Sequence, residues 1–124
     1  MRFGQMEKNK RIKITHIISG LNTGGAERAL YNLLESDFSS KYDCSVISLI
    51  DEGTYGIKIR ALGVPVYVIN MRANFSVLKS IIALRNIIKK IAPDVLQGWM
   101  YHGNLAATIA RYFCDSPAML AWNV

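Results

Sequence analysis

Apolar residues recur along the chain with two alternating patterns, which predict strands and helices in turn. Short, nearly continuous apolar runs rich in β-branched residues are typical of strands that are buried on both faces of a parallel sheet. Longer segments repeat apolar residues at spacings of three and four, which is the pattern of one helix face. The predicted strands are residues 12–18, 43–50, 64–69, 94–98 and 118–124, and the predicted helices are residues 25–36, 55–62, 76–91 and 104–113.

The two longest of these helices carry clear apolar stripes. In segment 25–36 the stripe consists of Ala26, Ala29, Leu30, Leu33 and Leu34. Segment 76–91 has a broader apolar face, which consists of Val77, Leu78, Ile81, Ile82, Leu84, Ile88 and Ile91. Ser76 is placed to cap this helix at its start, and Pro93 is placed to stop it.

The alternation of strands and helices predicts an α/β fold, a Rossmann-like three-layer αβα sandwich with a parallel sheet. Right-handed crossovers favour the strand order 3-2-1-4-5. In that order the chain changes direction across the sheet between the first and fourth strands, and ligands bind there, beyond the carboxyl ends of the strands. The loops 19–25 and 98–104 are therefore expected to be neighbours that form a site.

The first of these loops, SGLNTGG, places two adjacent glycines directly before a helix. Without a Cβ atom, Gly24 and Gly25 let a ligand approach the backbone closely, and the helix N-terminus favours an anion such as a diphosphate. The alternative is a tight turn in which Glu27, at the third helical position, only caps the helix. Both interpretations stay open from the sequence.

The spacing of the glycines excludes one motif and argues against another. The loop lacks the Gly-Lys-Ser/Thr ending of a P-loop, and its glycines at 20, 24 and 25 do not match the G-x-G-x-x-G dinucleotide fingerprint. Asp51 follows the second strand, where a ribose-binding acid lies in dinucleotide folds, but the glycine spacing argues against a nicotinamide or flavin cofactor.

The second loop, GWMYHGN, supplies polar and aromatic side chains. His102 follows the carboxyl end of a strand, where a histidine is either structural or placed for hydrogen bonding and proton transfer. Trp99 and Tyr101 are either lids of the core or platforms on which a sugar stacks. By contrast, His16 lies inside the first strand and is expected to be a packed structural histidine.

Composition and charge narrow the class of protein. The 124 residues suit one domain, and Cys44 and Cys114 are expected to be reduced thiols because two cysteines are too few for a disulfide framework. No apolar run reaches the length of a membrane span, and the N-terminus lacks the apolar region of a signal peptide. The expected location is therefore the cytoplasm, at most peripheral at the inner membrane face.

Residues 1–11 form a basic arm on a chain of net charge +6. Five cations fall within the first thirteen residues: Arg2, Lys8, Lys10, Arg11 and Lys13. Such an arm is either a solvated tail or a segment attracted to an anionic membrane surface. Nucleic acid is not expected as a partner, because no aromatic residues are interleaved with a basic patch.

Three segments together resemble a known family. ITHIISGLNTGGAERALYNLL, PDVLQGWMYHGNLAATIA and AWNV are similar to the N-terminal domain of group 1 glycosyltransferases, which are retaining, nucleotide-sugar-dependent enzymes of the GT-B architecture. The most specific part is the pairing of G-G-A-E after the first strand with W-M-Y-H-x-N-L after the fourth. LGVPVYVINMR resembles the family's third strand and the loop after it, so the resemblance covers nearly all of residues 12–124.

The resemblance implies a division of roles between two domains. Residues 12–124 would be an incomplete N-terminal, acceptor-side domain, and the C-terminal nucleotide-sugar domain with its E-x7-E motif is absent from this sequence. By position, His102 would be the catalytic residue that reaches toward the donor sugar. The residues implied for binding the donor diphosphate or the acceptor are Gly24, Gly25, Glu27, Tyr101, Asn104 and Asn123.

The implied reaction moves a sugar from a nucleotide diphosphate sugar to a glycan or lipid-linked acceptor in cell-surface polysaccharide synthesis, with no metal or other cofactor. The 124 residues alone are expected to be inactive, and to self-associate through an exposed strand edge and an uncovered cleft face. The alternative is a non-catalytic nucleotide- or sugar-binding module of the same Rossmann-like fold.

Overall fold

Five parallel strands form one sheet in the order β3-β2-β1-β4-β5, which confirms the predicted order. The structure is a computed structural model that describes residues 11–21, 24–70, 77–99 and 119–123. The strands are β1 (Lys13–Ile18), β2 (Asp43–Ser48), β3 (Val66–Val68), β4 (Val95–Trp99) and β5 (Met119–Asn123). The helices are α2 (Gly25–Glu35), α3 (Phe38–Lys41), α4 (Gly53–Ala61) and α5 (Val77–Ile91).

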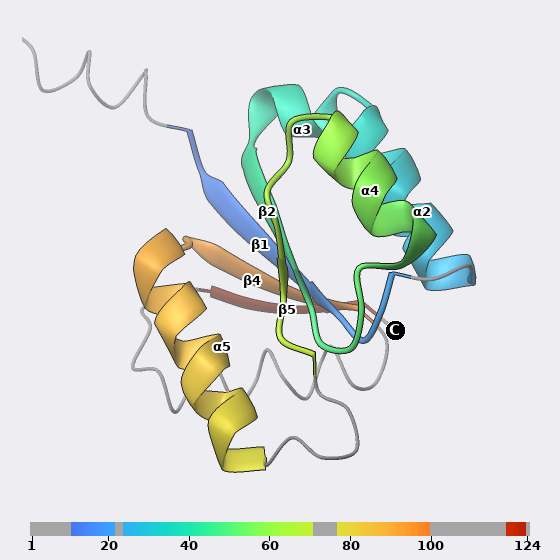
Figure 1. The fold of residues 1–124 in the computed structure, drawn as a ribbon. Helices are drawn as coiled ribbons and strands as arrows, with labels where there is room; N and C mark the ends of the chain where they lie inside the picture. Colours follow the sequence, from blue (N-terminus) through green and yellow to red (C-terminus); the bar gives the residue numbers. More distant parts are fainter. Residues whose placement is uncertain (1–10, 22–23, 71–76, 100–118, 124) are drawn as a thin grey trace, which may run out of the picture.

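The helices lie on both faces of the sheet (Figure 1), as the predicted sandwich requires. The helices α2 and α4 follow crossovers that run from β1 toward β3, whereas α5 follows the crossover from β3 back to β4. Because right-handed crossovers in opposite directions place their helices on opposite faces, α5 lies across the sheet from α2 and α4. The topology thus accounts for the three layers.

Two apolar clusters fill the spaces between these layers. On the α5 side, Ile17 and Leu96 pack with Leu84 and Ile88. On the other side, the core consists of Ile18, Leu21, Leu30, Leu34, Cys44, Val46, Ile59, Val64, Val66 and Trp99. Adjacent residues of β1 point to opposite clusters, because side chains alternate along a strand. The strands β1 and β2 therefore bury side chains on both faces of the sheet, which explains their continuous apolar runs.

The apolar stripe predicted for the first helix is confirmed at its centre. Leu30 and Leu34 are fully buried, and Ala26 and Leu33 pack partly against the same cluster. Ala29 is exposed, because it lies at the edge of the stripe.

The broad apolar face predicted for segment 76–91 is wrong at two positions. Leu84 and Ile88 are buried, but Leu78 and Ile82 are 67% and 47% exposed. Each lies six residues before one of the buried pair, which rotates it by roughly 240° around a helix and away from the sheet. The side chain of Val77 lies outside the described residues.

Most predicted boundaries agree with the structure to within a few residues. The segment 55–62 begins earlier, at Gly53, and the short helix α3 was not predicted. The predicted helix 104–113 and the proposed cap Ser76 lie outside the described residues. The strand β5 is confirmed, and it occupies one end of the strand order.

Candidate functional site

The carboxyl ends of β1, β4 and β5 lie side by side. Ile18, the last residue of β1, pairs with Trp99, the last residue of β4, and Trp99 pairs in turn with Asn123 of β5. The loop from β1 to α2 leaves the sheet at this same edge (Figure 1). The predicted direction change between β1 and β4 is therefore present, and it brings Asn123 within two strands of the glycine loop.

The start of the glycine loop is anchored by Asp51. The carboxylate oxygen Oδ1 of Asp51 accepts a hydrogen bond of 3.1 Å from the backbone N–H of Leu21. The Leu21 carbonyl accepts a 2.9 Å hydrogen bond from the N–H of Tyr55, and the Leu21 side chain is fully buried. A Cβ atom on Gly20 would lie 3.2 Å from the same Asp51 oxygen. Asp51 thus holds the loop, a role that its position after the second strand did not reveal.

The double glycine lies at the start of α2, where Gly24 is the N-cap residue. The Gly24 carbonyl accepts the N–H of Arg28 at 3.1 Å. A Cβ atom on Gly24 would lie 2.5 Å from Oε1 of Glu27, so the Glu27 carboxylate folds back over the cap. A carboxylate in the first turn suits the helix dipole. The two interpretations of this pair, ligand contact and capping, both stay predictions.

Gly25 differs from Gly24 in its surroundings. A Cβ atom on Gly25 would meet no atom within 4 Å, so open space lies beside this part of the backbone. The first turn of a helix presents backbone N–H groups without partners inside the helix, and these favour an anion. The approach of a ligand to Gly25 stays a prediction that the open space permits.

Trp99 belongs to the core. Its side chain is 8% exposed, and its indole Nε1–H donates a 3.0 Å hydrogen bond to Nδ1 of His16. The indole can only donate, so Nδ1 of His16 is the acceptor and the neutral imidazole carries its proton on Nε2. This contact ties β4 to β1 near the site and excludes Trp99 as a sugar-stacking platform.

His16 is the packed structural histidine that was predicted. It is 1% exposed, and burial lowers its pKa from 6.5 to about 4. The imidazole is therefore neutral at physiological pH, which preserves the acceptor on Nδ1. The contact between His16 and Trp99 was not predicted, although both residues point to the α2 side from adjacent strands.

Other predicted site residues lie outside the described residues. Tyr101, His102 and Asn104 follow the end of β4, and their roles stay predictions. Asn123 is described as a position in β5, beside Trp99. The structure therefore brings together Gly24, Gly25 and Glu27 at one edge of the sheet and places Asn123 at the same edge.

A hollow of about 380 Å³ lies between α2 and the strands β1 and β4. It is lined by Ile14, His16, Ala29, Leu33, Val95, Gln97 and Trp99. The lining is mainly apolar, and the hollow follows the face of the sheet below the site edge. The hollow adds no charged group to the candidate site.

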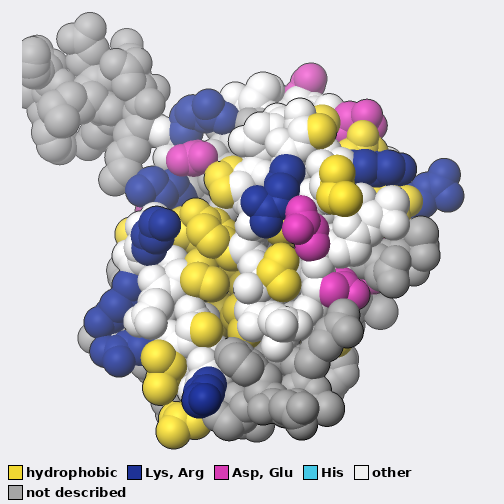
Figure 2. Space-filling view, in the orientation of Figure 1, with side chains coloured by type: hydrophobic (Ala, Val, Ile, Leu, Met, Phe, Trp, Pro, Cys, Tyr) yellow, Lys and Arg dark blue, Asp and Glu magenta, His cyan; other side chains and the backbone are white. Residues whose placement is uncertain are grey.

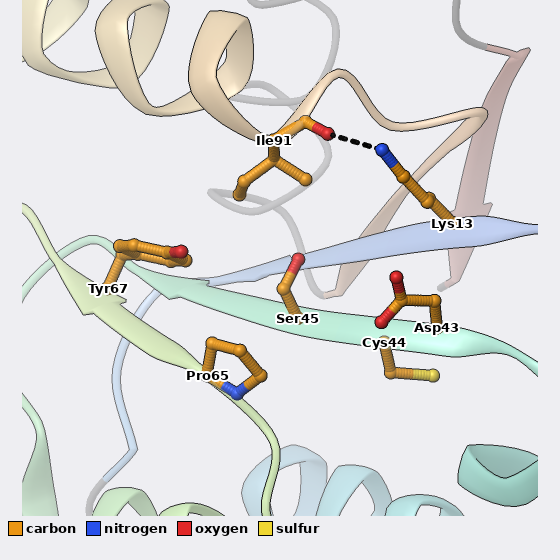
Figure 3. A pocket seen from close by; sticks show the side chains of 7 residues that line it. All are labelled: Lys13, Asp43, Cys44, Ser45, Pro65, Tyr67 and Ile91. Carbon is orange, nitrogen blue, oxygen red and sulfur yellow. Dashed lines mark hydrogen bonds between the residues drawn. The ribbon is translucent and has the colours of Figure 1, made fainter.

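A smaller hollow of about 200 Å³ lies at the opposite end of the sheet (Figure 3). It is lined by Lys13, Asp43, Cys44, Ser45, Pro65, Tyr67 and Ile91. The Lys13 ammonium donates to the Ile91 carbonyl at 3.4 Å. Lys13 and Asp43 begin their strands, so this hollow lies at the amino edge and is separate from the candidate site.

The described residues contain neither a metal-binding cluster nor a helix that could span a membrane. Among the described residues, no three His, Cys, Asp or Glu side chains gather closely enough to hold a metal ion. Within the same residues, no helix is both long and apolar enough to cross a membrane.

Comparison with known proteins identifies the class of domain. The family model described as "Glycosyl transferase 4-like" matches residues 28–122, which is more than half of the chain. The match begins one residue after Glu27, includes Tyr101, His102 and Asn104, and ends one residue before Asn123. No curated protein matches the chain.

Proposed function

The chain belongs to the glycosyl transferase 4-like family, and we propose that it is the acceptor-side domain of a retaining glycosyltransferase. The donor is a nucleotide diphosphate sugar, and the acceptor is a glycan or a lipid-linked glycan of cell-surface polysaccharide synthesis. The observation that carries the proposal is the family match over a sheet whose β1 and β4 ends meet beside the glycine loop. Fold alone would not support a function, but the family and the placement of this loop agree.

The proposed chemistry depends on positioning and charge stabilisation. The bond between the anomeric carbon and the diphosphate oxygen breaks, the acceptor oxygen bonds to that carbon, and the acceptor proton leaves with the diphosphate. Negative charge therefore develops on the diphosphate, which the first turn of α2 beside Gly25 is placed to stabilise. His102 acts at the donor sugar in this proposal, and Tyr101, Asn104 and Asn123 line the acceptor side.

Substitution of Gly25 tests the use of this helix start. The side chain of Gly25→Leu would enter the open space beside the backbone, so the variant should fold and yet obstruct a ligand there. Thr54→Leu is the matched control, because Thr54 is exposed in the first turn of α4. The readout is release of nucleoside diphosphate by the intact gene product, measured with candidate nucleotide sugars and an acceptor.

We expect Gly25→Leu to lower the release rate by about tenfold or more, which corresponds to losing one well-placed anion contact of about 1.4 kcal/mol. Thr54→Leu should keep the wild-type rate. Equal rates for Gly25→Leu and wild type would refute the role given to the α2 N-terminus. Donor binding without any transfer would instead favour the non-catalytic nucleotide- or sugar-binding module.

A further inference from the structure

The hollow of about 200 Å³ at the amino edge of the sheet is lined by polar side chains from neighbouring strands. On the face that α5 covers, β1 begins with Lys13 and Thr15. The same face of β2 begins with Asp43 and Ser45, because side chains alternate along a strand. The next residue of β1 on this face is Ile17, which belongs to the apolar cluster under α5. The amino ends of the two strands therefore present charged and hydroxyl groups instead of apolar ones.

Ser45 brings a buried hydroxyl to this hollow. Its side chain is 6% exposed, and its Oγ atom shares a hydrogen bond of 2.9 Å with Oγ1 of Thr15. A hydroxyl can donate once and accept twice, so Ser45 keeps further hydrogen-bonding capacity. In Figure 3 the Tyr67 hydroxyl and the Asp43 carboxylate point toward the same space as the Ser45 hydroxyl. Donors and acceptors therefore converge on one small volume.

The charges around the hollow are balanced. The Lys13 ammonium donates to the Ile91 carbonyl at 3.4 Å, at the C-terminal end of α5, where the helix dipole is negative. The Lys90 Nζ atom lies 5.9 Å from the centroid of the Tyr67 ring. A bound anion would meet the Asp43 carboxylate and the end of the helix dipole, and a bound cation would meet the two ammonium groups. The surroundings therefore favour an uncharged ligand that has both donors and acceptors.

The remaining walls are apolar, and the volume limits the size of a ligand. Pro65 and Ile91 line the hollow beside the Tyr67 ring. Figure 2 shows apolar side chains on the surface between α5 and α4, with basic side chains beside them. At about 30 Å³ per water molecule, the hollow has room for about six or seven waters. This is less than the roughly 300 Å³ at which sites for larger organic ligands begin, so a nucleotide or an oligosaccharide would not fit.

We propose that the amino-edge hollow binds one uncharged sugar residue. The ring hydroxyls accept from the Lys13 ammonium and donate to the Asp43 carboxylate. The Ser45 and Tyr67 hydroxyls bond the remaining ring oxygens. The C–H groups of the sugar ring lie against Ile91. A compact ring that carries hydroxyls on all sides uses the polar groups and the apolar wall at the same time.

This site is distinct from the candidate site. The strand β1 (Lys13–Ile18) runs from the hollow to the edge where the glycine loop begins. At about 3.3 Å per residue it spans roughly 17 Å, which is too far for one sugar ring to contact both ends. Binding in the hollow therefore does not depend on transfer at the candidate site, and it goes beyond the proposed function. It would hold a carbohydrate on the domain away from the reacting edge.

Titration of the isotope-labelled full chain, followed through its amide NMR signals, tests the proposal and locates the ligand. The probes are the methyl glycosides of glucose, galactose and N-acetylglucosamine. The references are acetate as an anion, glycine as a zwitterion and sorbitol as an open-chain polyol. Each is added to about 50 mM, because a ligand this small is expected to bind with a Kd of about 1–10 mM. The amides of residues 43–45 and 66–68 report on the hollow, and those of Gly25 and Asn123 report on the candidate site.

Two variants remove single polar groups from the hollow. Tyr67→Phe removes one hydroxyl and keeps the ring, and Asp43→Ala removes an exposed carboxylate, so both should fold. Circular dichroism and thermal unfolding would verify this. Tyr31→Phe is the control for the first variant, because Tyr31 is a half-buried tyrosine of α2, on the other face of the sheet. Asp37→Ala is the control for the second, because it also removes an exposed carboxylate and changes the net charge equally.

At least one glycoside should shift the amides around the hollow and reach saturation, whereas the three references should leave them unchanged. Tyr67→Phe should weaken this binding about fivefold. Asp43→Ala should weaken it by at least about tenfold, because hydrogen bonds to charged groups are the stronger ones. The two control variants should bind the glycoside as wild type does.

Several results would overturn the proposal. The glycosides could produce no saturable shift at the hollow, or acetate, glycine or sorbitol could produce the same shifts. The shifts could be confined to the amides of Gly25 and Asn123, which would place the sugar at the candidate site. The hollow variants could keep wild-type affinity, or the controls could lose as much. Loss of sugar transfer with normal binding in the hollow would count against the proposed function alone.

Discussion

Acidification is expected to destabilise the protein through one buried histidine. His16 is enclosed between β2, β4 and α2, and its Nδ1 accepts the indole N–H of Trp99 at 3.0 Å. Protonation would charge a side chain that is 1% exposed and would replace that acceptor with a second donor. The folded state therefore resists protonation of His16, whereas the unfolded chain takes up the proton freely.

The magnitude follows from the two pKa values of His16. Burial lowers the pKa to about 4 in the folded state, against 6.5 in the unfolded chain. At about 1.4 kcal/mol per pH unit, the difference is worth about 3 kcal/mol of the free energy of unfolding. Because the folded pKa is the lower one, this stability is fully present above pH 6.5. It is lost as the pH falls toward about 4, and no more is lost below that.

The variant His16→Asn isolates this effect. The Oδ1 atom of Asn can take the place of Nδ1 as the acceptor for Trp99, but Asn does not titrate. Urea unfolding of both proteins at a series of pH values gives the free energy of unfolding for each. Carboxyl groups titrate equally in both, so the difference between the two curves belongs to His16. Wild type should lose about 3 kcal/mol more than the variant between pH 6.5 and 4. Parallel curves would refute the reasoning.

Two further predictions concern a half-buried carboxylate and a buried thiol near the sheet. Asp51→Ala removes the carboxylate that accepts the Leu21 N–H, and should lower the free energy of unfolding by about 1–3 kcal/mol in urea titration. Asp51→Asn keeps an oxygen acceptor and should retain most of the wild-type stability. Burial, with a smaller contribution from Asp43, raises the pKa of the Cys44 thiol to about 11. In a Cys114→Ser background, Cys44 should therefore react with a disulfide reagent only on unfolding; rapid reaction of the folded protein would contradict this.

The sheet could be predicted from the sequence because its signals are local. Each buried strand is a short apolar run, and the alternation with helices fixes the strand order through the handedness of the crossovers. The helix α3 was not predicted because its four residues, FSSK, are too few to show a periodic pattern of apolar positions. Leu78 and Ile82 were misassigned because periodicity shows that a helix is apolar but does not limit how much of it the sheet can cover.

The site was predictable as an edge of the sheet but not in its contacts. Topology places Gly25 and Asn123 at the same edge before any side chain is known. The hydrogen bond between Leu21 and Asp51 joins residues 30 positions apart, and the hydrogen bond between Trp99 and His16 joins residues 83 positions apart. No spacing in the sequence indicates either contact. The roles of Tyr101 and His102 stay predictions because both lie outside the described residues.

Acceptor-dependent release of nucleoside diphosphate tests the central claim most directly. The intact gene product is incubated with labelled nucleotide sugars, with and without a glycan or lipid-linked acceptor, beside His102→Ala and the control Ile57→Ser. Wild type and Ile57→Ser should release nucleoside diphosphate only when the acceptor is present. The sugar transferred to the acceptor should retain its anomeric configuration. His102→Ala should be slower by about 100-fold or more. Absence of transfer by wild type with every donor, or full activity of His102→Ala, would contradict a sugar transferase that acts at this edge of the sheet.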